Sequence, residues 1–546
     1  MKFFPLRFFA AICCAIIISG CGKQASPPTQ NDTVRFAMEK DLSTLDPANL
    51  TDPITFRVMG QIYEGLLTLD ENNQAQPAIA ESWTSNDKHD VWTFTIRKGV
   101  YFQSSPVFGS AQTRELTPDD VVYSLTRSVA PGMVSGFALG NVIDGADAYT
   151  NGKAQSVSGL RVLDGNRVEV HLTHPELYFP YRLTSPYIAI YPKEAVDQGA
   201  DVFAKQHPIG TGPYQVVSAS DTELSLERND KYWRGFGPGA PRKVVFRVIQ
   251  NEQLRQLEFK NGKIDILPVT PGLMPSFLEK SAGGVDQKPV LTADLQNNYG
   301  LYANADFNSY FIAFQAEKVP AAVRKAINLA VDRDEIIRTI TYGTAIPREG
   351  TIPTGMQGYQ APFKTPVPDP EAAKRVLIEA GLVPGSVKVE LLVHELDSSE
   401  ALGELLQARL KPAGINLVLR KVDFNEAMRL MSDGNFEALA MKFQYIYSSP
   451  EPILTSIYSS KEIPDPNIWH YRSPQVDLLI DSYSAAQNRD DLNRISAQIE
   501  TVVFADSPAV FLYQAQSLFV FPKSLSGLTF NGHGMPLLYK VNLGGN

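Results

Sequence analysis

Residues 91–97, Val-Trp-Thr-Phe-Thr-Ile-Arg, form a strand pattern, and residues 116–125, Leu-Thr-Pro-Asp-Asp-Val-Val-Tyr-Ser-Leu, form a helix pattern shortly after it. In the first, every second residue is apolar: Trp92, Phe94 and Ile96. Such alternation predicts a strand with one buried face. In the second, Thr117 provides an N-cap, Pro118 stands in the first turn, and Asp120 completes a capping box. A helix is therefore expected to start there.

The same two patterns recur along the chain. Residues 167–172 alternate as a second half-buried strand. Helices are expected to begin at Pro320 and at Asp369, and Gly381 stands where the second of them needs a left-handed residue. Mixed strands and helices at this spacing predict an α/β body without a solenoid repeat.

The N-terminus has the features of an export signal. Residues 1–7 carry two positive charges, residues 8–18 are apolar, and small residues precede Cys21. That order is typical of a signal peptide, and the apolar run is well below the ~20 residues of a membrane-spanning helix. We therefore expect residues 1–20 to be removed and the remaining chain to lie outside the cytoplasm.

A lipid anchor is expected at Cys21. The sequence Ile18-Ser-Gly-Cys21 resembles the bacterial lipobox, in which the cysteine is acylated and becomes the new N-terminus. Residues 22–31 are polar and include two prolines, which suits a flexible tether. The sequence thus predicts a protein of the periplasm or cell surface that is lipid-anchored to a membrane, without indicating which membrane.

The composition excludes several classes of site from the mature chain. The three cysteines are Cys13, Cys14 and Cys21, so disulfides, cysteine metal ligands and cysteine nucleophiles are not expected in the folded body. Loss of Lys2 and Arg7 with the signal changes the formal net charge from −9 to −11. That acidic balance argues against a nucleic-acid partner.

Catalytic motifs are not found in the sequence. No phosphate-binding G-x-x-x-x-G-K-[ST] occurs, and the serine of residues 132–136, Gly-Met-Val-Ser-Gly, stands one place too late for a nucleophile elbow. Of the seven histidines only His171 and His174 are close, and on a strand this spacing sends the side chains to opposite faces. Acid pairs such as Asp119 and Asp120 stand at helix starts, where carboxylates act as caps. The sequence therefore predicts no enzyme, no cofactor and no metal site.

Several segments resemble the bacterial extracellular solute-binding proteins of family 5, which include the oligopeptide-, dipeptide- and nickel-binding components of ABC importers. The most specific likeness is Pro77-Ala-Ile-Ala-Glu-Ser-Trp83, followed by residues 92–102 and by residues 116–125. Residues 103–115 depart from the family, because this loop is longer and richer in serine and glycine. Further matching segments are Ser43-Thr-Leu-Asp-Pro47, Ile62-Tyr-Glu-Gly-Leu66, Ile209-Gly-Thr-Gly-Pro-Tyr214, Arg228-Asn-Asp-Lys-Tyr-Trp233, Val323-Arg-Lys-Ala-Ile327, Asp369-Pro-Glu-Ala-Ala-Lys374 and Tyr471-Arg-Ser-Pro-Gln-Val-Asp477.

The resemblance implies two α/β lobes joined by a hinge, with an extra domain inserted in the first lobe and a ligand enclosed between the lobes. Closure excludes water, which strengthens a few fixed polar contacts in the cleft. The closed form is what a membrane partner recognises, here an ABC permease and ATPase complex. The expected division is a signal peptide at 1–20, a lipidated tether at 21–31, the first lobe at 32–71, the inserted domain at 72–200, the first lobe again at 201–290, the second lobe at 291–504 and a return to the first lobe at 505–546.

The resemblance also suggests residues that contact the ligand. The first strand ends at the cleft in the family, which implicates Ala37, Met38 and Glu39. A second stretch matches one in which an aspartate, three residues before an acid–Pro step, pairs with the amino terminus of a peptide. Taking Ser449-Pro450 as that step puts Ile446 in the position of the aspartate. The other expected ligand-binding residues are His394, Tyr445, Tyr447 and Ser448.

Both charged clamps of the dipeptide binders are missing by this comparison. Ile446 replaces the acid, and residues 387–397 contain His394 and Glu395 where those proteins have an arginine for the ligand carboxylate. Burying an ammonium without a counter-charge costs several kcal/mol, so free dipeptides are expected to bind poorly. The leading interpretation is a lipoprotein that delivers a small peptide or peptide-like solute to an ABC importer. Alternatives are a sensor or scaffold with the same fold, or a binder of a non-peptide solute such as an oligosaccharide.

Overall fold

A computed structural model of the chain describes residues 32–280, 288–348, 350–360, 367–394, 399–445 and 447–544. Internal contacts divide the chain into residues 1–31 and residues 32–546, and the described residues all belong to the second unit. Cys21 and the predicted signal peptide therefore lie outside the described residues. Among the described helices, none combines the length and the apolar character needed to cross a membrane.

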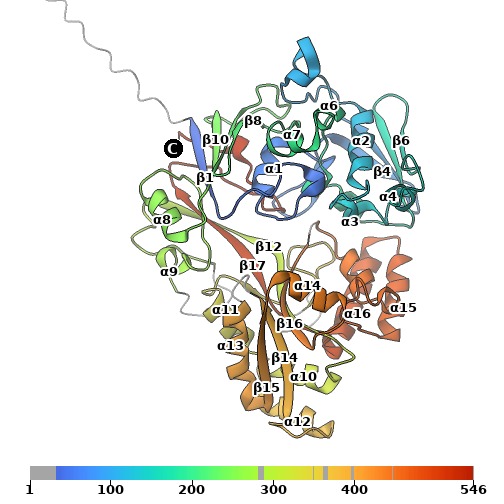
Figure 1. Cartoon of the computed structure of the whole chain (residues 1–546), viewed down its shortest axis with the longest axis vertical. Helices are drawn as coiled ribbons and strands as arrows, with labels where there is room; N and C mark the ends of the chain where they lie inside the picture. Colours follow the sequence, from blue (N-terminus) through green and yellow to red (C-terminus); the bar gives the residue numbers. More distant parts are fainter. Residues whose placement is uncertain are drawn as a thin grey trace, which may run out of the picture. The chain divides into compact units, whose positions relative to one another are not determined.

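A four-stranded sheet in the order β1-β10-β9-β8 organises the first lobe (Figure 1). β1 runs parallel to β10, and the other neighbours are antiparallel. Phe36 of β1 is fully buried, with its ring centre 5.6 Å from that of Phe246 on β10. The strands are β1 (Thr33–Met38), β8 (Tyr214–Ala219), β9 (Glu223–Arg228) and β10 (Lys243–Val248). The helices between and after them include α1 (Phe56–Ile62), α6 (Lys193–Val196), α7 (Ala200–Lys205), α8 (Glu252–Lys260) and α9 (Met274–Phe277).

A second four-stranded sheet confirms the strand patterns read from the sequence. Its order is β4-β5-β7-β6, and all neighbours are antiparallel. Every second residue of β5 is buried, as the alternation predicted: Trp92, Phe94 and Ile96. The elements of this region are β4 (Ala80–Ser85), β5 (Val91–Ile96), α2 (Pro118–Ser128), α3 (Gly136–Leu139), α4 (Ala146–Thr150), β6 (Leu160–Val162), β7 (Arg167–His171) and α5 (Phe179–Arg182). A two-stranded sheet of β2 (Leu67–Leu69) and β3 (Ala75–Pro77) precedes them.

The placement of His174 on a strand was wrong, because β7 ends at His171. The two histidines nonetheless do not face each other. His171 Nε2 lies 2.7 Å from Glu169, whereas His174 Nε2 lies 3.6 Å from Glu451, which belongs to a distant segment.

The predicted capping box starts α2 and also holds the long loop before it. The Oδ2 atom of Asp120 accepts a hydrogen bond from the backbone N–H of Thr117 at 2.9 Å, as a capping box requires. Arg114, near the end of the loop, donates to Asp120 at 2.7 Å and to Glu194 of α6 at 2.8 Å. The C-terminal end of the loop is therefore tied to two helices.

The Gly-Thr-Gly segment at 210–212 lies against the backbone that follows α1. A Cβ atom on Gly210 would stand 2.2 Å from the carbonyl oxygen of Ile62, so no side chain fits there. Gln103 stabilises this contact between the two backbone segments, since its Nε2 donates to the carbonyls of Tyr214 at 2.6 Å and Ile62 at 2.9 Å. Its Oε1 accepts from the backbone N–H of Gly210 at 3.0 Å. The shape of this turn thus depends on close backbone approach, which explains the glycines in physical terms.

A seven-stranded sheet joins the first lobe to the second (Figure 1). Its order is β11-β17-β12-β16-β14-β15, with β13 paired to β17. β12 and β17 are the long members, and they pair antiparallel from Tyr299 opposite Pro522 to Ala313 opposite Ala509. The strands are β11 (Leu267–Pro268), β12 (Tyr299–Phe314), β13 (Ile346–Pro347), β14 (Val387–His394), β15 (Ile415–Val422), β16 (Ala438–Gln444) and β17 (Ala509–Pro522).

A bulge interrupts the pairing of the two long strands near their middle. β12 advances from Ala305 to Ser309 while β17 moves only from Gln516 to Gln514. Residues 306–308 therefore stand opposite Ala515 alone, and such a bulge bends a strand and redirects its side chains.

Helices cover the second-lobe part of this sheet, and those predicted from the sequence are confirmed. α10 follows Pro320, and α12 follows the N-cap Asp369, whose side chain accepts from the N–H of Ala372 at 2.7 Å. Gly381 has the expected left-handed backbone, with φ of 76°. The helices are α10 (Ala321–Ala330), α11 (Arg333–Ile340), α12 (Pro370–Glu379), α13 (Ser399–Leu410), α14 (Phe424–Ser432), α15 (Pro474–Ser484) and α16 (Arg489–Asp506). The predicted two-lobed α/β fold is confirmed, while the exact domain limits stay predictions.

Candidate functional site: a cavity between the lobes

A cavity of about 530 Å³ lies where β1, α1 and β11 of the first lobe meet the long strands and the start of the second lobe. Its wall is formed by residues from β12, β16 and β17 together with residues 39–57, 268–274, 340–345 and 532–534. The volume is in the range of about 300–1,000 Å³ that holds small ligands in proteins. We refer to it as the inter-lobe cavity.

An ion pair forms one side of the inter-lobe cavity. Arg57 of α1 donates through Nη1 to Glu39 Oε2 at 2.6 Å, and both side chains are largely buried. The guanidinium of Arg57 also lies 5.0 Å from the ring centre of Phe519. The aromatic face and the carboxylate together fix the direction of the guanidinium. A ligand on this side therefore meets two preorganised charges rather than two mobile ones.

Asp306 contributes a second acid, at the bulge of β12. Its Oδ2 accepts a hydrogen bond from Ser517 Oγ at 2.7 Å, and its carbonyl oxygen accepts from Gln514 Nε2 at 2.9 Å. Burial raises the pKa of Asp306 from 3.8 to about 6, although the bond from Ser517 and the charge of Arg57 oppose the shift. Its charge is therefore sensitive to anything that changes the hydration of the cavity.

Replacement of Asp306 by asparagine tests this environment. A carboxyl with a raised pKa stabilises the fold when protonated, and this contribution is lost as the pH rises through about 6. Above neutral pH, Asp306→Asn is expected to raise the free energy of unfolding by about 1–2 kcal/mol. This is about half of the free energy that corresponds to the pKa shift, because the side chain is partly exposed to solvent. Near pH 4 the difference should largely vanish. Urea unfolding from about pH 4 to about pH 8 measures it, with Asp221→Asn in an exposed turn as the control. A difference that does not change with pH would contradict the raised pKa.

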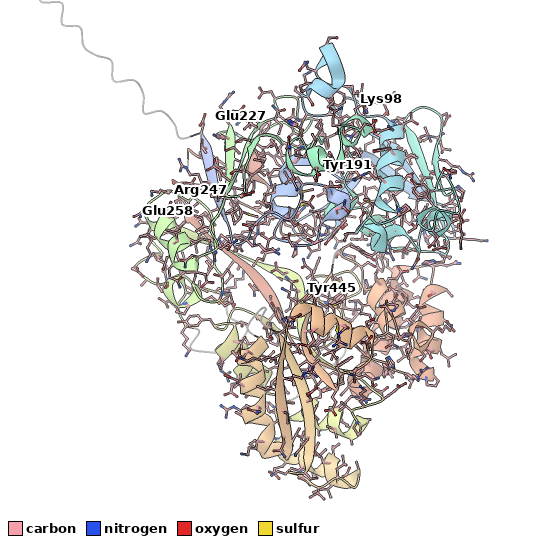
Figure 2. The ribbon with its side chains drawn as sticks, viewed as in Figure 1. Lys98, Tyr191, Glu227, Arg247, Glu258 and Tyr445 are labelled. Atoms are coloured by element: carbon pink, nitrogen blue, oxygen red, sulfur yellow. The ribbon has the colours of Figure 1, made fainter. Side chains whose placement is uncertain are left out.

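Tyrosines provide part of the apolar area of the inter-lobe cavity. The rings of Tyr310 and Tyr513 stack with centres 4.5 Å apart and an interplanar angle of 18°. Tyr445, labelled in Figure 2, follows β16 directly and donates its hydroxyl to the carbonyl of Thr351. Burial raises the pKa of Tyr445, so it remains a neutral donor at physiological pH. These rings offer flat apolar walls, and the hydroxyl of Tyr445 is already hydrogen-bonded.

The structure brings only part of the predicted ligand-binding set to the inter-lobe cavity. Glu39 and Tyr445 line it. The other described members do not: Ala37 and Met38 are buried within β1, His394 ends β14, and Tyr447 and Ser448 are buried outside the lining. Ile446 lies outside the described residues, as does Glu395. The ligand role of each of these residues stays a prediction.

Tyr447 belongs to a buried contact between distant segments. Arg182 of α5 donates through Nη1 to the hydroxyl of Tyr447 at 2.6 Å and through Nε to Glu176 Oε1 at 2.6 Å. Burial and the nearby acids leave the hydroxyl of Tyr447 with a pKa above its ordinary value. The side chain therefore joins 176–182 to the segment after β16.

Arg57, Asp306, Ser517 and the pair Tyr310–Tyr513 were missed by sequence reasoning. The signal for some of them was present, because β12 and β17 are apolar strands interrupted by polar residues at their middle. Polar residues on both faces of a buried strand indicate either a bulge or a site. Here both explanations apply at the same place.

Comparison with known proteins identifies related sequences. Residues 74–465 match the sequence model of bacterial extracellular solute-binding proteins, family 5, middle region. Heme-binding protein A of Haemophilus influenzae is 22% identical over 534 residues, which cover 95% of this chain and 93% of that protein. The dipeptide-binding protein of Escherichia coli is 25% identical over 457 residues, 80% of each chain. The glutathione-binding protein GsiB of Salmonella typhimurium is 23% identical over 517 residues, 92% of this chain and 93% of that one.

Solved structures of the same group share the fold. HbpA2 from Haemophilus parasuis superposes with a TM-score of 0.77 at 21% identity, covering 94% of this chain and 99% of that one. The periplasmic binding protein DppA from Helicobacter pylori, solved with the peptide STSA, has a TM-score of 0.73 at 23% identity over 94% of this chain and 98% of that one.

Proposed function

Because the chain belongs to family 5 of the bacterial extracellular solute-binding proteins, we propose that it captures a small peptide or peptide-like solute between its lobes and delivers it to an ABC importer. The observation that carries this proposal is the inter-lobe cavity itself, with Glu39, Arg57, Asp306 and Lys442 in its wall. Charges of both signs beside tyrosine walls suit a zwitterionic or amide-rich solute.

The identity of the solute is the open part of this proposal. The names of the relatives differ in their ligands, which are heme, dipeptides and glutathione. The acid of the first strand, Glu39, is already paired with Arg57. An ammonium would have to compete with that guanidinium, so a free amino terminus is not expected to be required. A non-peptide solute such as an oligosaccharide is the alternative ligand class, and a sensor or scaffold of the same fold is the alternative role.

Binding to a panel of solutes tests the proposal. A bound solute at ~100 times its dissociation constant is expected to raise the free energy of unfolding by about 2.7 kcal/mol. The panel contains short peptides with free and with acetylated amino termini, glutathione, heme and oligosaccharides, measured by thermal shift and then by calorimetry. Acetylated peptides are expected to bind at least as tightly as free ones.

Cavity variants localise the binding. Lys442→Ala and Gln516→Ala each remove a polar side chain from the cavity wall and are expected to weaken binding about tenfold, or about 1.4 kcal/mol. Lys98→Ala is the matched control, since Lys98, labelled in Figure 2, is exposed and is not among the residues that line the cavity. Unchanged affinity in both cavity variants would place the solute elsewhere. If tight peptide binding is lost when the peptide's amino terminus is acetylated, an acidic side chain of this protein pairs with the free ammonium group.

We also propose lipid anchoring through Cys21, supported by its lipobox-like sequence. Cys21→Ser is expected to abolish incorporation of labelled fatty acid and to leave the protein either released or unprocessed, because acyl chains contribute about 0.8 kcal/mol per buried CH₂. Cys14→Ser is the matched control, since Cys14 lies within the apolar run and should leave anchoring intact. A processed Cys21→Ser protein that still sediments with membranes after a carbonate wash would contradict the anchor.

A genetic observation separates transport from sensing. A solute importer needs permease and ATPase partners, so deletion of this protein should abolish uptake of the bound solute while leaving the permease in place. Wild-type uptake in the deletion strain, together with solute binding in vitro, would favour the sensor.

A further inference from the structure

Three side chains of types that can bind a metal ion converge at a contact between distant segments, apart from the inter-lobe cavity. His174 and Glu176 lie between β7 and α5, and Glu451 precedes the π-helical turn Ile453–Ile457 of the second lobe. One donor atom from each lies within 4.8 Å of the other two. His174 Nε2 is 3.6 Å from Glu451 Oε1. None of the three lines the inter-lobe cavity.

The carboxylate of Glu176 has one oxygen that the described residues leave unpaired. The side chain is fully buried, and its Oε1 accepts from Arg182 Nε at 2.6 Å. Its Oε2 is buried and has no hydrogen-bond partner among the described residues. An unpaired carboxylate oxygen in the interior costs free energy unless a positive group satisfies it. A carboxylate oxygen of Glu176 lies within 4.8 Å of the donor atoms of His174 and Glu451, and Oε2 is the oxygen that Arg182 leaves available.

We infer that His174, Glu176 and Glu451 hold a divalent cation, and that zinc suits the donor set best. One imidazole and two carboxylates are ordinary ligands of zinc, which binds them at about 2.0–2.2 Å. An ion at that distance from His174 Nε2 and Glu451 Oε1 would span their 3.6 Å separation at an angle of roughly 120°, close to tetrahedral geometry.

Two neighbouring features fit this assignment. His174 is the exposed member, with 43% of its side chain accessible, so an ion can enter and a water molecule can complete its shell. Arg182 donates a hydrogen bond to Oε1 of Glu176 and another to the hydroxyl of Tyr447. These bonds orient the carboxylate of Glu176, as hydrogen-bond partners of the ligands do in metal sites. The ion would cross-link the inserted region at 174–176 to the second lobe at Glu451.

Metal titration tests the inference directly. The full chain, purified in mild detergent and stripped with EDTA, is titrated with zinc by calorimetry, and its melting temperature is recorded with and without the ion. We expect one zinc per chain and a melting temperature higher by several degrees, whereas magnesium should have no effect. His174→Ala and Glu451→Gln should each weaken zinc binding at least tenfold. These variants keep Glu176, the buried partner of Arg182, so they are expected to fold.

A nearby histidine supplies the control. His171→Ala removes a histidine that contacts Glu169 instead of the cluster, and it should bind zinc as the wild type does. Failure to bind one equivalent of zinc, or equal affinity in His174→Ala, would overturn the inference. So would a stripped protein whose melting temperature does not change when zinc is added, because a proton shared by the carboxyl groups of Glu176 and Glu451 would then fill the place of the ion; burial raises the pKa of Glu176, which favours such a proton.

Discussion

Replacing Arg182 by alanine is expected to lower the free energy of unfolding by about 3–5 kcal/mol. Only 6% of the Arg182 side chain is exposed, and the side chain of its partner Glu176 is fully buried. Its Nη1 also donates to the carbonyl of Ala138 at 3.0 Å. Removal of the guanidinium leaves three buried groups without their hydrogen-bond donor: the carboxyl group of Glu176, the carbonyl of Ala138 and the hydroxyl of Tyr447.

Urea unfolding of EDTA-treated protein measures this loss without interference from bound metal. Arg420→Ala is the matched control, because Arg420 is 41% exposed and pairs with Glu426 at the surface. Such exposed pairs contribute about 0–1 kcal/mol. If Arg182→Ala costs no more than Arg420→Ala, water must reach the Glu176 carboxylate and the contact between these segments is not closed in solution.

Gly210→Ala is expected to destabilise the protein by about 3 kcal/mol or more, because there is no space for the added methyl group. The new Cβ would stand 2.2 Å from the carbonyl oxygen of Ile62 and 2.7 Å from a ring carbon of Tyr63. Backbone must move to relieve the first contact, and that movement would break the hydrogen bonds of Gln103 to the same turn.

Gly136→Ala is the control for the glycine substitution. A Cβ there has no neighbour closer than 3.9 Å, so this change should be neutral or slightly stabilising. The two variants are compared by thermal unfolding. Equal melting temperatures would show that the turn at 210–212 accommodates a side chain and that its glycines have another purpose.

Local patterns along the sequence were enough to predict several strands and helices, but not the site. The capping box at Thr117 and the alternation in β5 are determined by neighbours in sequence, and both were found as expected. Asp306 lies in the cavity wall because β12 pairs with β17, about 200 residues later in the chain, and Arg57 is brought to the same wall from α1. The polar residues in the middle of β12 and β17 indicate that a site or a bulge is present, but no short-range pattern shows which distant segments meet there.

The alignment of the second-lobe segment shows a different limit. Ile446 was placed opposite the family's aspartate by counting from Ser449-Pro450, although the literal acid–Pro step is Glu451-Pro452. Counting from the latter would put Ser448 in that position, and neither choice provides an acid. Either alignment therefore predicts that no acid stands where the family's aspartate pairs with a peptide amino terminus. Only the residue that replaces the aspartate depends on which alignment is used.

The bulge in β12 makes a change in the length of this strand very different in its effect from a substitution within it. Three residues of β12 stand opposite Ala515, and they place Asp306 in the cavity wall while Tyr310, beyond the bulge, stacks on Tyr513. Loss of one of the three would exchange inward and outward faces for the rest of the strand, because side chains alternate with a period of two. Substitutions at 306–308 change the chemistry of the wall and leave that alternation intact. Ligand preference can thus diverge by exchange of residues within a strand of fixed length.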